Sequence, residues 1–241
     1  MRNGMTIGCR VATLATAVVL ATEGFAGTFT APEGCTVYMT VQSRACRVSN
    51  HYTCAADNPG DKWRADFDQE GQFFRSMIDN ETQWIESYDL EPPEIQTLDA
   101  NRTDPASFSE LLADGRDDFA FDLSRETGID TSVSGYDRLT GKTFVIDGIA
   151  LQETEFDFTE TDRAGNVTRK ASGNEYIHPE WRLFFAGPGQ TLLDGQSVPI
   201  DGSPLQFIFP GEPGFAATQP LFECDDVLSG DPDGVIRVRG E

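Results

Sequence analysis

From residue 62 onward, apolar and polar residues alternate in short runs that Gly, Asp, Asn and Pro interrupt. This alternation is typical of antiparallel β-strands that bury one face. The clearest run places Phe119, Phe121 and Leu123 on one face of a strand. Three continuous apolar stretches predict more deeply buried strands, at 143–146, 182–185 and 205–209. The whole pattern predicts about ten strands.

Two segments are predicted to form β-hairpins, because each contains two strand patterns that lie close together. The first covers residues 155–176 and turns at 162–166, where the sequence is Asp-Arg-Ala-Gly-Asn. The second joins residues 72–79 to residues 83–88. Hairpins of this kind build a sheet in which strands that are consecutive in sequence lie side by side.

A single helix is predicted from Pro105 to about Asp114. Asp104 is placed to cap the N-terminus, and proline is favoured at the first helical position. Gly115 stands where a left-handed residue often ends a helix. The apolar residues between them follow the i, i+3, i+4 spacing, so we expect the helix to lie against the sheet.

These elements predict a mainly β fold. The strands would form an antiparallel meander, shaped as a curved half-barrel or a barrel-like sheet, with one short helix and disulfide bonds. Alternation alone does not distinguish a barrel from a half-barrel or a sandwich. The chain contains 17 Phe, 5 Tyr and 3 Trp, which is enough large apolar side chain for a packed core.

The first 26 residues have a different pattern. Arg2 and Arg10 precede an apolar run at 11–21, and the small residues Gly24 and Ala26 follow it. This is the layout of a secretory signal peptide, with cleavage expected after Ala26. The run is shorter than the roughly 20 residues that a membrane-spanning helix needs, so we expect no integral membrane segment after cleavage.

The exported chain is therefore predicted to be periplasmic or secreted. Residues 27–241 are expected to form a single β-rich domain that ends in a mobile acidic tail from about 227. The whole sequence carries 18 Lys and Arg against 40 Asp and Glu, a formal net charge of -22. Such a polyanion is repelled by nucleic acids and by anionic membrane surfaces, so no nucleic-acid partner is expected.

Four cysteines follow the predicted cleavage site, and an even number in an oxidising compartment is typical of disulfides. They are Cys35, Cys46, Cys54 and Cys224. Two bridges among four cysteines allow three connectivities. The absence of a CxxC motif from the sequence, and the presence of only two histidines, argue against a zinc site or a catalytic thiol.

Strand geometry favours one connectivity. The register that suits the patterns of 36–42 and 46–53 pairs Val37 with Tyr52, Val41 with Val48 and Cys35 with Cys54. Directly opposed residues have Cα atoms about 4.5 to 5.5 Å apart, which is within disulfide reach. Cys46 and Cys54 at the two ends of one strand would be about 26 Å apart. Cys46 is therefore expected to bond to Cys224.

Some short motifs resemble functional sites but fit structural roles better. His178 and Glu180 are the minimum for a metal site or an acid–base pair, but Pro179 predicts a turn that enters a strand. Residues 66–71 resemble the start of a calcium loop. Its twelfth position would be Met77, where a bidentate glutamate is required, so a hairpin turn is predicted instead.

Two further motifs lead to no assigned site. Ser197 lies in a segment, 195–199, that lacks the second glycine of the GxSxG nucleophile elbow. Four aspartates near the C-terminus are predicted to belong to the mobile tail, namely Asp225, Asp226, Asp231 and Asp233. We therefore assign no catalytic, metal-binding or cofactor-binding residue. A pair of catalytic carboxylates stays open as an alternative, because sequence spacing does not report their separation in space.

Aromatic residues are the candidates for lining a ligand pocket. They are Trp63, Trp84, Trp181 and Phe184. Aromatic side chains on strands more often belong to the core. The segments CRVSNHYTC (46–54), GDKWRADFD (60–68) and IDNETQWIESYD (78–89) resemble those of uncharacterised secreted proteins of Gram-negative bacteria. The resemblance implies export to the periplasm and brings no activity with it.

The sequence favours a non-enzymatic β protein that binds a small apolar ligand or a partner in the cell envelope. The alternative is a secreted hydrolase that uses carboxylates or a cation. The two differ in what the inner face of the sheet should hold. A binding protein would have an apolar, aromatic-lined cavity, whereas a hydrolase would have convergent acidic groups with raised pKa values.

Overall fold

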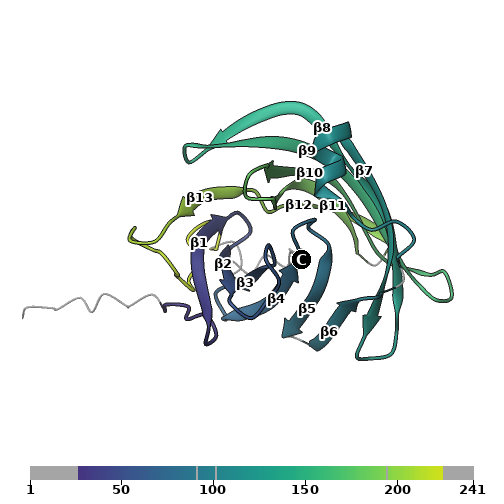
Figure 1. Ribbon diagram of the computed structural model, residues 1–241, viewed down its shortest axis with the longest axis horizontal. Helices are drawn as coiled ribbons and strands as arrows, with labels where there is room; N and C mark the ends of the chain where they lie inside the picture. The colour runs from purple at the N-terminus through teal and green to yellow at the C-terminus, as the bar shows by residue number, and fades with distance from the viewer. Residues whose placement is uncertain (1–26, 91, 101, 194, 225–241) are drawn as a thin grey trace, which may run out of the picture.

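The computed structural model describes residues 27–90, 92–100, 102–193 and 195–224. The predicted signal peptide and the predicted acidic tail lie outside these residues. The described chain is mainly β, with thirteen strands and one short helix (Figure 1).

All thirteen strands belong to one antiparallel sheet. They are β1 (Cys35–Ser43), β2 (Arg47–Cys54), β3 (Lys62–Phe67), β4 (Gln72–Ile78), β5 (Trp84–Leu90), β6 (Pro93–Leu98), β7 (Arg116–Arg125), β8 (Thr131–Ile146), β9 (Ile149–Asp162), β10 (Val167–His178), β11 (Leu183–Leu193), β12 (Gln196–Asp201) and β13 (Pro204–Ile208). The sheet order runs from β12 down to β1 in sequence order and then to β13. The predicted antiparallel meander is confirmed.

The number of strands exceeds the prediction of about ten, because some strands carry little apolar patterning. The two sheet strands β6 and β12 have the sequences PEIQTL and QSVPID, in which polar residues outnumber the large apolar ones. Their ladder hydrogen bonds to β5 and β11 hold them in the sheet. Both predicted hairpins are present, as β4–β5 and β9–β10.

The edges of the sheet are β12 and β13, which are consecutive in sequence. Gly202 and Ser203 join them, and β12 pairs with β11 whereas β13 pairs with β1. Within the described residues no ladder pairs β12 with β13, so the sheet is not a closed barrel. The barrel alternative of the sequence prediction is therefore wrong. The sheet stays open because the chain turns at Gly202 and Ser203. After this turn β13 pairs with β1, whereas β12 before it pairs with β11.

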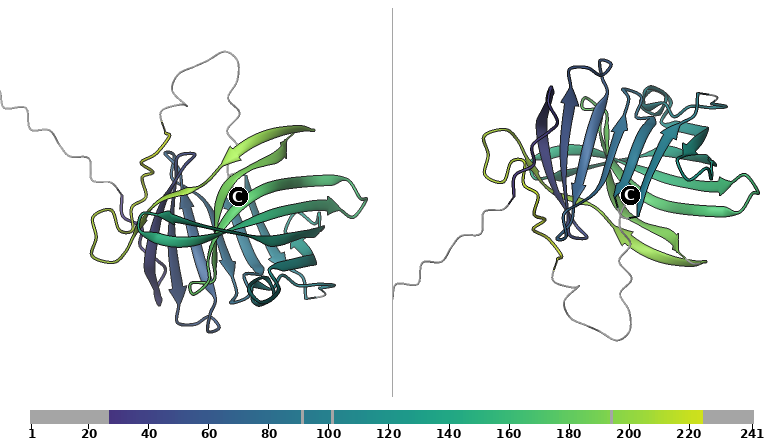
Figure 2. Two further views of the ribbon diagram at one scale, coloured as in Figure 1. Left: turned by 90° about the horizontal axis from the view of Figure 1, so that it is seen from above. Right: turned by 90° about the horizontal axis from the view of Figure 1, so that it is seen from below.

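The two ends of the sheet pack against each other. Figure 2 shows the purple and blue strands of the N-terminal part running across the direction of the green strands. A cluster of buried apolar side chains includes Val41 from β1, Leu151 from β9, Phe185 from β11 and Phe207 from β13. The ring centroids of Phe185 and Phe207 are 5.1 Å apart. Burying each such side chain contributes about 1.5 to 3 kcal/mol, so this contact supports the fold substantially.

Helix α1 (Phe108–Asp114) begins three residues after the predicted start. Ser107 is its N-cap and accepts a hydrogen bond from the Glu110 backbone N–H. The predicted cap, Asp104, instead exchanges backbone hydrogen bonds with Ala120 of β7, which removes it from the helix. Gly115 ends the helix at a φ of 78°, as predicted. The helix lies against the sheet through the cluster of Phe108, Leu111 and Ile177.

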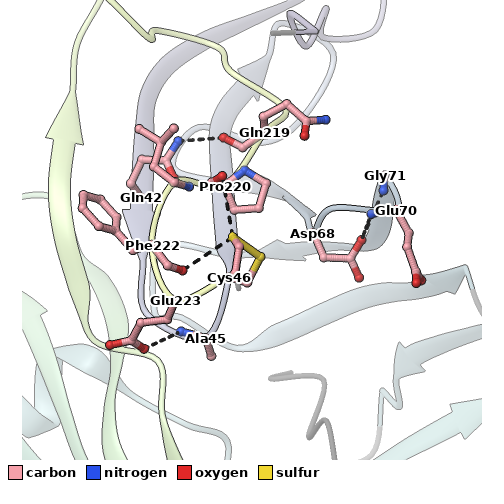
Figure 3. Close-up of a disulfide and its surroundings, with 12 residues drawn as sticks. Gln42, Ala45, Cys46, Asp68, Glu70, Gly71, Gln219, Pro220, Phe222 and Glu223 are labelled. Atoms are coloured by element: carbon pink, nitrogen blue, oxygen red, sulfur yellow. Dashed lines mark hydrogen bonds between the residues drawn. A yellow bond between two sulfur atoms is a disulfide. The ribbon is translucent and has the colours of Figure 1, made fainter. Parts of the chain in front are cut away.

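Two disulfides join the predicted cysteines. Cys35 bonds to Cys54, and Cys46 bonds to Cys224. Figure 3 shows how the second bridge fastens the end of the described chain beside the β1–β2 hairpin. The Gln42 side-chain amide donates to the Gln219 carbonyl at 3.1 Å, on the same side. The disulfide and this hydrogen bond therefore both hold residues 219–224 against the β1–β2 hairpin.

The register of β1 and β2 differs from the prediction in its second half. Val37 faces Tyr52, as predicted, but a bulge follows Val37. Val41 consequently faces Ser49 and not Val48. A bulge inserts one residue into one strand, which regular counting from the sequence does not detect.

Two of the strand segments predicted from the sequence differ in how deeply their side chains are buried. Phe119, Phe121 and Leu123 of β7 are all buried, as their alternation predicts. The stretch at 143–146 is more exposed than predicted, since Phe144 is 37% and Val145 72% accessible. This stretch lies next to the turn of the β8–β9 hairpin, where the strands have few neighbours to cover them.

Candidate functional site

Strands of the sheet line a cavity of about 600 Å³. Strand pairing explains which of the lining residues share a face, because directly opposed residues on neighbouring strands point to the same side. Two rows of paired residues contribute most of the lining discussed below. We call them the polar row and the apolar row.

The polar row crosses six strands from β2 to β7. It consists of His51, Arg64, Ser76, Ser87, Gln96 and Arg125, each paired with the next. All six residues line the cavity. This wall of the cavity therefore presents an imidazole, two guanidinium groups, two hydroxyls and an amide.

The apolar row crosses five strands from β7 to β11. It consists of Phe119, Gly135, Phe158, Ala171 and Thr191 in successive pairs. All but Gly135 line the cavity, and a side chain at Gly135 would collide with the Phe158 Cβ, 2.7 Å from the position of its own Cβ. The absence of a side chain at Gly135 therefore lets β8 and β9 approach closely at this pair.

Further aromatic rings extend the apolar row. Trp84 lies edge-on to Phe121 and to Phe158, with ring centroids 5.5 and 5.8 Å apart. Phe156 stacks on Phe158 at 6.2 Å. Trp84, Phe121 and Phe156 all line the cavity. The contacts between the rings hold them together in one wall of the cavity.

Three of the four aromatic residues proposed from the sequence line the cavity, namely Trp63, Trp84 and Phe184. Trp63 also stacks on Tyr52 and donates its indole N–H to Asp57 at 2.8 Å. Trp181 lies elsewhere, in the core cluster formed by the two ends of the sheet. There it stacks on His178 of the neighbouring turn, with ring centroids 3.8 Å apart.

Three of the arginines that line the cavity, namely Arg64, Arg125 and Arg169, have carboxylate partners. Arg64 lies 3.0 Å from the fully buried carboxylate of Asp66. Arg125 donates to the fully buried carboxylate of Glu160 at 2.6 Å. Arg169 lies over the Phe158 ring at 4.7 Å and reaches Glu160 at 4.0 Å. Each of these guanidinium groups is therefore at least partly neutralised.

Three acidic residues on the same face have raised pKa values. Burial raises the pKa of Asp117 to about 6, against a hydrogen bond from the Ser107 N–H that lowers it. Burial and the charges of Glu175 and Asp117 raise the pKa of Asp137 well above its usual value. Burial raises the pKa of Glu175 to about 7, although Arg64 and Arg169 act in the opposite direction. Asp137 and Glu175 line the cavity directly.

His51 is the buried histidine of the polar row, with 4% of its surface accessible. Burial and the nearby Arg64 lower the pKa of His51 to about 3. The imidazole is consequently neutral at physiological pH and presents one hydrogen-bond donor and one acceptor. No side-chain hydrogen bond within the described residues engages its ring, whose contacts are with Tyr38 and Phe185.

The other motifs considered from the sequence occupy turns and an edge strand. His178 accepts a hydrogen bond from the Trp181 backbone N–H, which closes the turn between β10 and β11. Asp68 accepts from the Glu70 and Gly71 backbone in the β3–β4 turn. Ser197 lies on β12 and donates to Gln190. The aspartates of the tail lie outside the described residues, within which no group of three potential metal ligands occurs.

Sequence reasoning missed Asp137, Glu175 and His51. One signal was present for the acidic cluster, because Asp117 shares the alternation of Phe119, Phe121 and therefore the buried face of β7. No such signal marks Asp137, Glu175 or His51, because these residues come together only through the register of several strands in the folded sheet.

Comparison of the chain with protein-family models, with curated protein sequences and with solved structures finds no match. Within the described residues, no helix has both the length and the apolar character needed to span a membrane. The argument for function therefore depends on the geometry of the cavity.

Proposed function

We propose that this protein is exported to the periplasm or secreted, and that it binds a small, largely apolar ligand in the cavity between the polar and apolar rows. The observation that carries the proposal is the aromatic lining of a cavity of about 600 Å³. Binding sites for small molecules commonly have volumes of about 300 to 1,000 Å³, apolar walls and a few polar groups. The cavity has both kinds of wall.

The proposal includes a shape for the sheet. Lining residues come from strands as distant in the sheet order as β2 and β11, through His51 and Phe184. A curved half-barrel would allow one face of a single sheet to surround a ligand in this way. The contact between the two ends of the sheet supports this geometry.

Export is supported by the covalent chemistry of the chain. Two disulfides hold a 241-residue protein that begins with a predicted signal peptide. Disulfides persist in oxidising compartments and are rare in the reducing cytosol. A ligand is favoured over an envelope protein as the partner because the aromatic surface faces a cavity.

A second function is favoured by one observation. Asp137 and Glu175 line the cavity and have raised pKa values, as a general acid of a hydrolase would. This alternative predicts that the protein cleaves glycosides or esters. A panel of chromogenic glycosides and esters would test it, and the activity would be lost in both Asp137→Asn and Glu175→Gln.

The binding proposal is tested with a neutral apolar probe, diphenylhexatriene, whose fluorescence increases in apolar surroundings. The mature protein is expected to bind it saturably, with one site per chain. Ser76→Trp places a bulky side chain in the polar row and should weaken binding about tenfold or more, which is about 1.4 kcal/mol. Ser132→Trp is the matched control, because Ser132 is exposed on β8. Absence of saturable binding, or equal binding by both variants, would contradict the proposal.

A further inference from the structure

Two carboxyl groups in the cavity stand without bonded partners. Asp137 of β8 and Glu175 of β10 belong to the sheet face that lines the cavity. Within the described residues, no hydrogen bond or salt bridge engages either carboxyl group, and their interactions are electrostatic ones at longer range. Both side chains are partly buried and reach the cavity, so a ligand group that enters it can contact their carboxyl groups.

The surroundings of Asp137 are negative. Asp117 is its direct cross-strand partner on β7 and has only 3% of its surface accessible. Like charges placed directly opposite each other destabilise a sheet. The groups that act on Asp137 are Glu175 and Asp117, and those that act on Glu175 include Arg64 from β3 and Arg169 from its own strand.

Arg64, Arg125 and Arg169 do not neutralise this pair by direct contact, because each is engaged by another carboxylate. Arg64 has Asp66 at 3.0 Å, and both Arg125 and Arg169 lie within 4.0 Å of Glu160. Each guanidinium thus has a nearer carboxylate partner than Asp137 or Glu175. A cation that enters the cavity would find two carboxyl groups available to it.

His51 gives an independent indication that a polar ligand group is missing. It is more than nine-tenths buried, it faces the cavity, and its ring makes no side-chain hydrogen bond within the described residues. A buried polar group without a partner costs free energy that a ligand can recover. The polar row therefore presents a hydrogen-bonding group to a ligand that lies against the apolar row.

We propose that the ligand of this cavity is an organic amine, whose ammonium group binds Asp137 and Glu175 and whose apolar body packs against Phe119, Phe158 and the neighbouring rings. The inference rests on the proposed ligand-binding function. An ammonium group fits better than a bare metal ion, because the described residues contain no group of three potential metal ligands. An ammonium group needs fewer ligands and brings an apolar body that the rings can contact.

Three probes with the same ring system separate the charge from the apolar body. They are naphthylmethylamine, naphthylmethanol and naphthoic acid, titrated into the mature protein by isothermal titration calorimetry near pH 7. The amine is expected to bind about tenfold or more tightly than the alcohol, and the acid more weakly than both. Titration of the amine in buffers of different ionisation enthalpy should also show proton release, because an ammonium group favours the ionised carboxyls.

Variants assign the preference to the two carboxyls. Asp137→Asn and Glu175→Gln should each lower the affinity for the amine about tenfold and leave the affinity for the alcohol unchanged. Asp118→Asn is the matched control, since Asp118 is exposed next to Asp117 and should change neither affinity. Equal affinities for amine and alcohol in the parent protein would overturn the amine inference while leaving the binding proposal standing. If neither the amine nor the alcohol binds, both proposals are overturned.

Discussion

The guanidinium of Arg125 on β7 donates to the carboxylate of Glu160 on β9 across the intervening strand β8, at 2.6 Å. The side chain of Glu160 is fully buried, and its carboxylate also accepts from the Thr131 hydroxyl. Removing one partner from a buried ion pair leaves the other charge uncompensated in a medium of low dielectric constant. This pair therefore links the polar row to the strands of the apolar row.

Replacing Arg125 with Met is expected to lower the free energy of unfolding by about 3 kcal/mol, because Glu160 would lose its nearest cation. Arg138→Met is the matched control, since Arg138 pairs with Glu155 where both side chains are exposed. That change should cost less than about 1 kcal/mol. Urea denaturation of the three proteins measures both values. Equal losses in the two variants would contradict the buried role of Arg125.

The two disulfides should differ in their contributions to stability. Cys46–Cys224 spans 178 residues and Cys35–Cys54 spans 19. Loop-closure entropy in the unfolded chain predicts about 5 kcal/mol for the first and about 3 kcal/mol for the second. Urea denaturation of the two double-serine variants should show the larger loss in the variant without Cys46 and Cys224. The opposite order would show that native-state effects outweigh chain entropy at these bridges.

The contact between the ends of the sheet is expected to be a large source of stability. Phe185 is buried in it and packs on Phe207. Phe185→Ala should lower the free energy of unfolding by about 3 to 5 kcal/mol, by loss of buried area and creation of a cavity. Val145→Ala, at a residue that is 72% exposed, should change it by less than about 0.5 kcal/mol. A small loss in Phe185→Ala would mean that the two ends separate readily in solution.

Glu175 should make the unliganded protein less stable as the pH rises. Its pKa is raised from 4.5 to about 7, so the folded state holds this proton more tightly than the unfolded state. The resulting stability is fully present below pH 4.5 and is lost as the pH approaches 7. Glu175→Gln does not titrate at this position. Its free energy of unfolding should exceed that of the parent protein by about 3 kcal/mol at about pH 8 and match it near pH 4.

Chemical denaturation across this pH range measures the difference between the two proteins. Glu180→Gln provides the control at an exposed glutamate and should follow the parent profile at every pH. A Glu175→Gln profile parallel to that of the parent would show that Glu175 is ionised normally in the folded protein.

Local patterns in the sequence predicted the elements that depend on neighbouring residues. The alternation of Phe119, Phe121 and Leu123 predicted a buried strand face, and hairpin geometry predicted the Cys35–Cys54 bond. The start of α1 was misplaced because Asp104 and Ser107 are both good capping residues. In the folded protein Asp104 pairs with Ala120, so Ser107 is the residue that caps the helix.

The candidate site could not be predicted in this way. Asp137 and Glu175 are 38 residues apart in sequence and approach only through the register of three strands, β8, β9 and β10. His51 reaches the same cavity from β2. A bulge such as the one after Val37 shifts every later pairing by one residue, so one undetected bulge changes which side chains face the cavity.

Native mass spectrometry of the protein purified from the cells that naturally produce it tests most directly whether the cavity holds a ligand. The mature chain is expected to carry a non-covalent small molecule, released on denaturation, in the parent and in Ser132→Trp but not in Ser76→Trp. An adduct that contains a basic nitrogen would also support the amine inference. A mass equal to that of the polypeptide alone, from protein that was never denatured or exposed to detergent, would contradict the account.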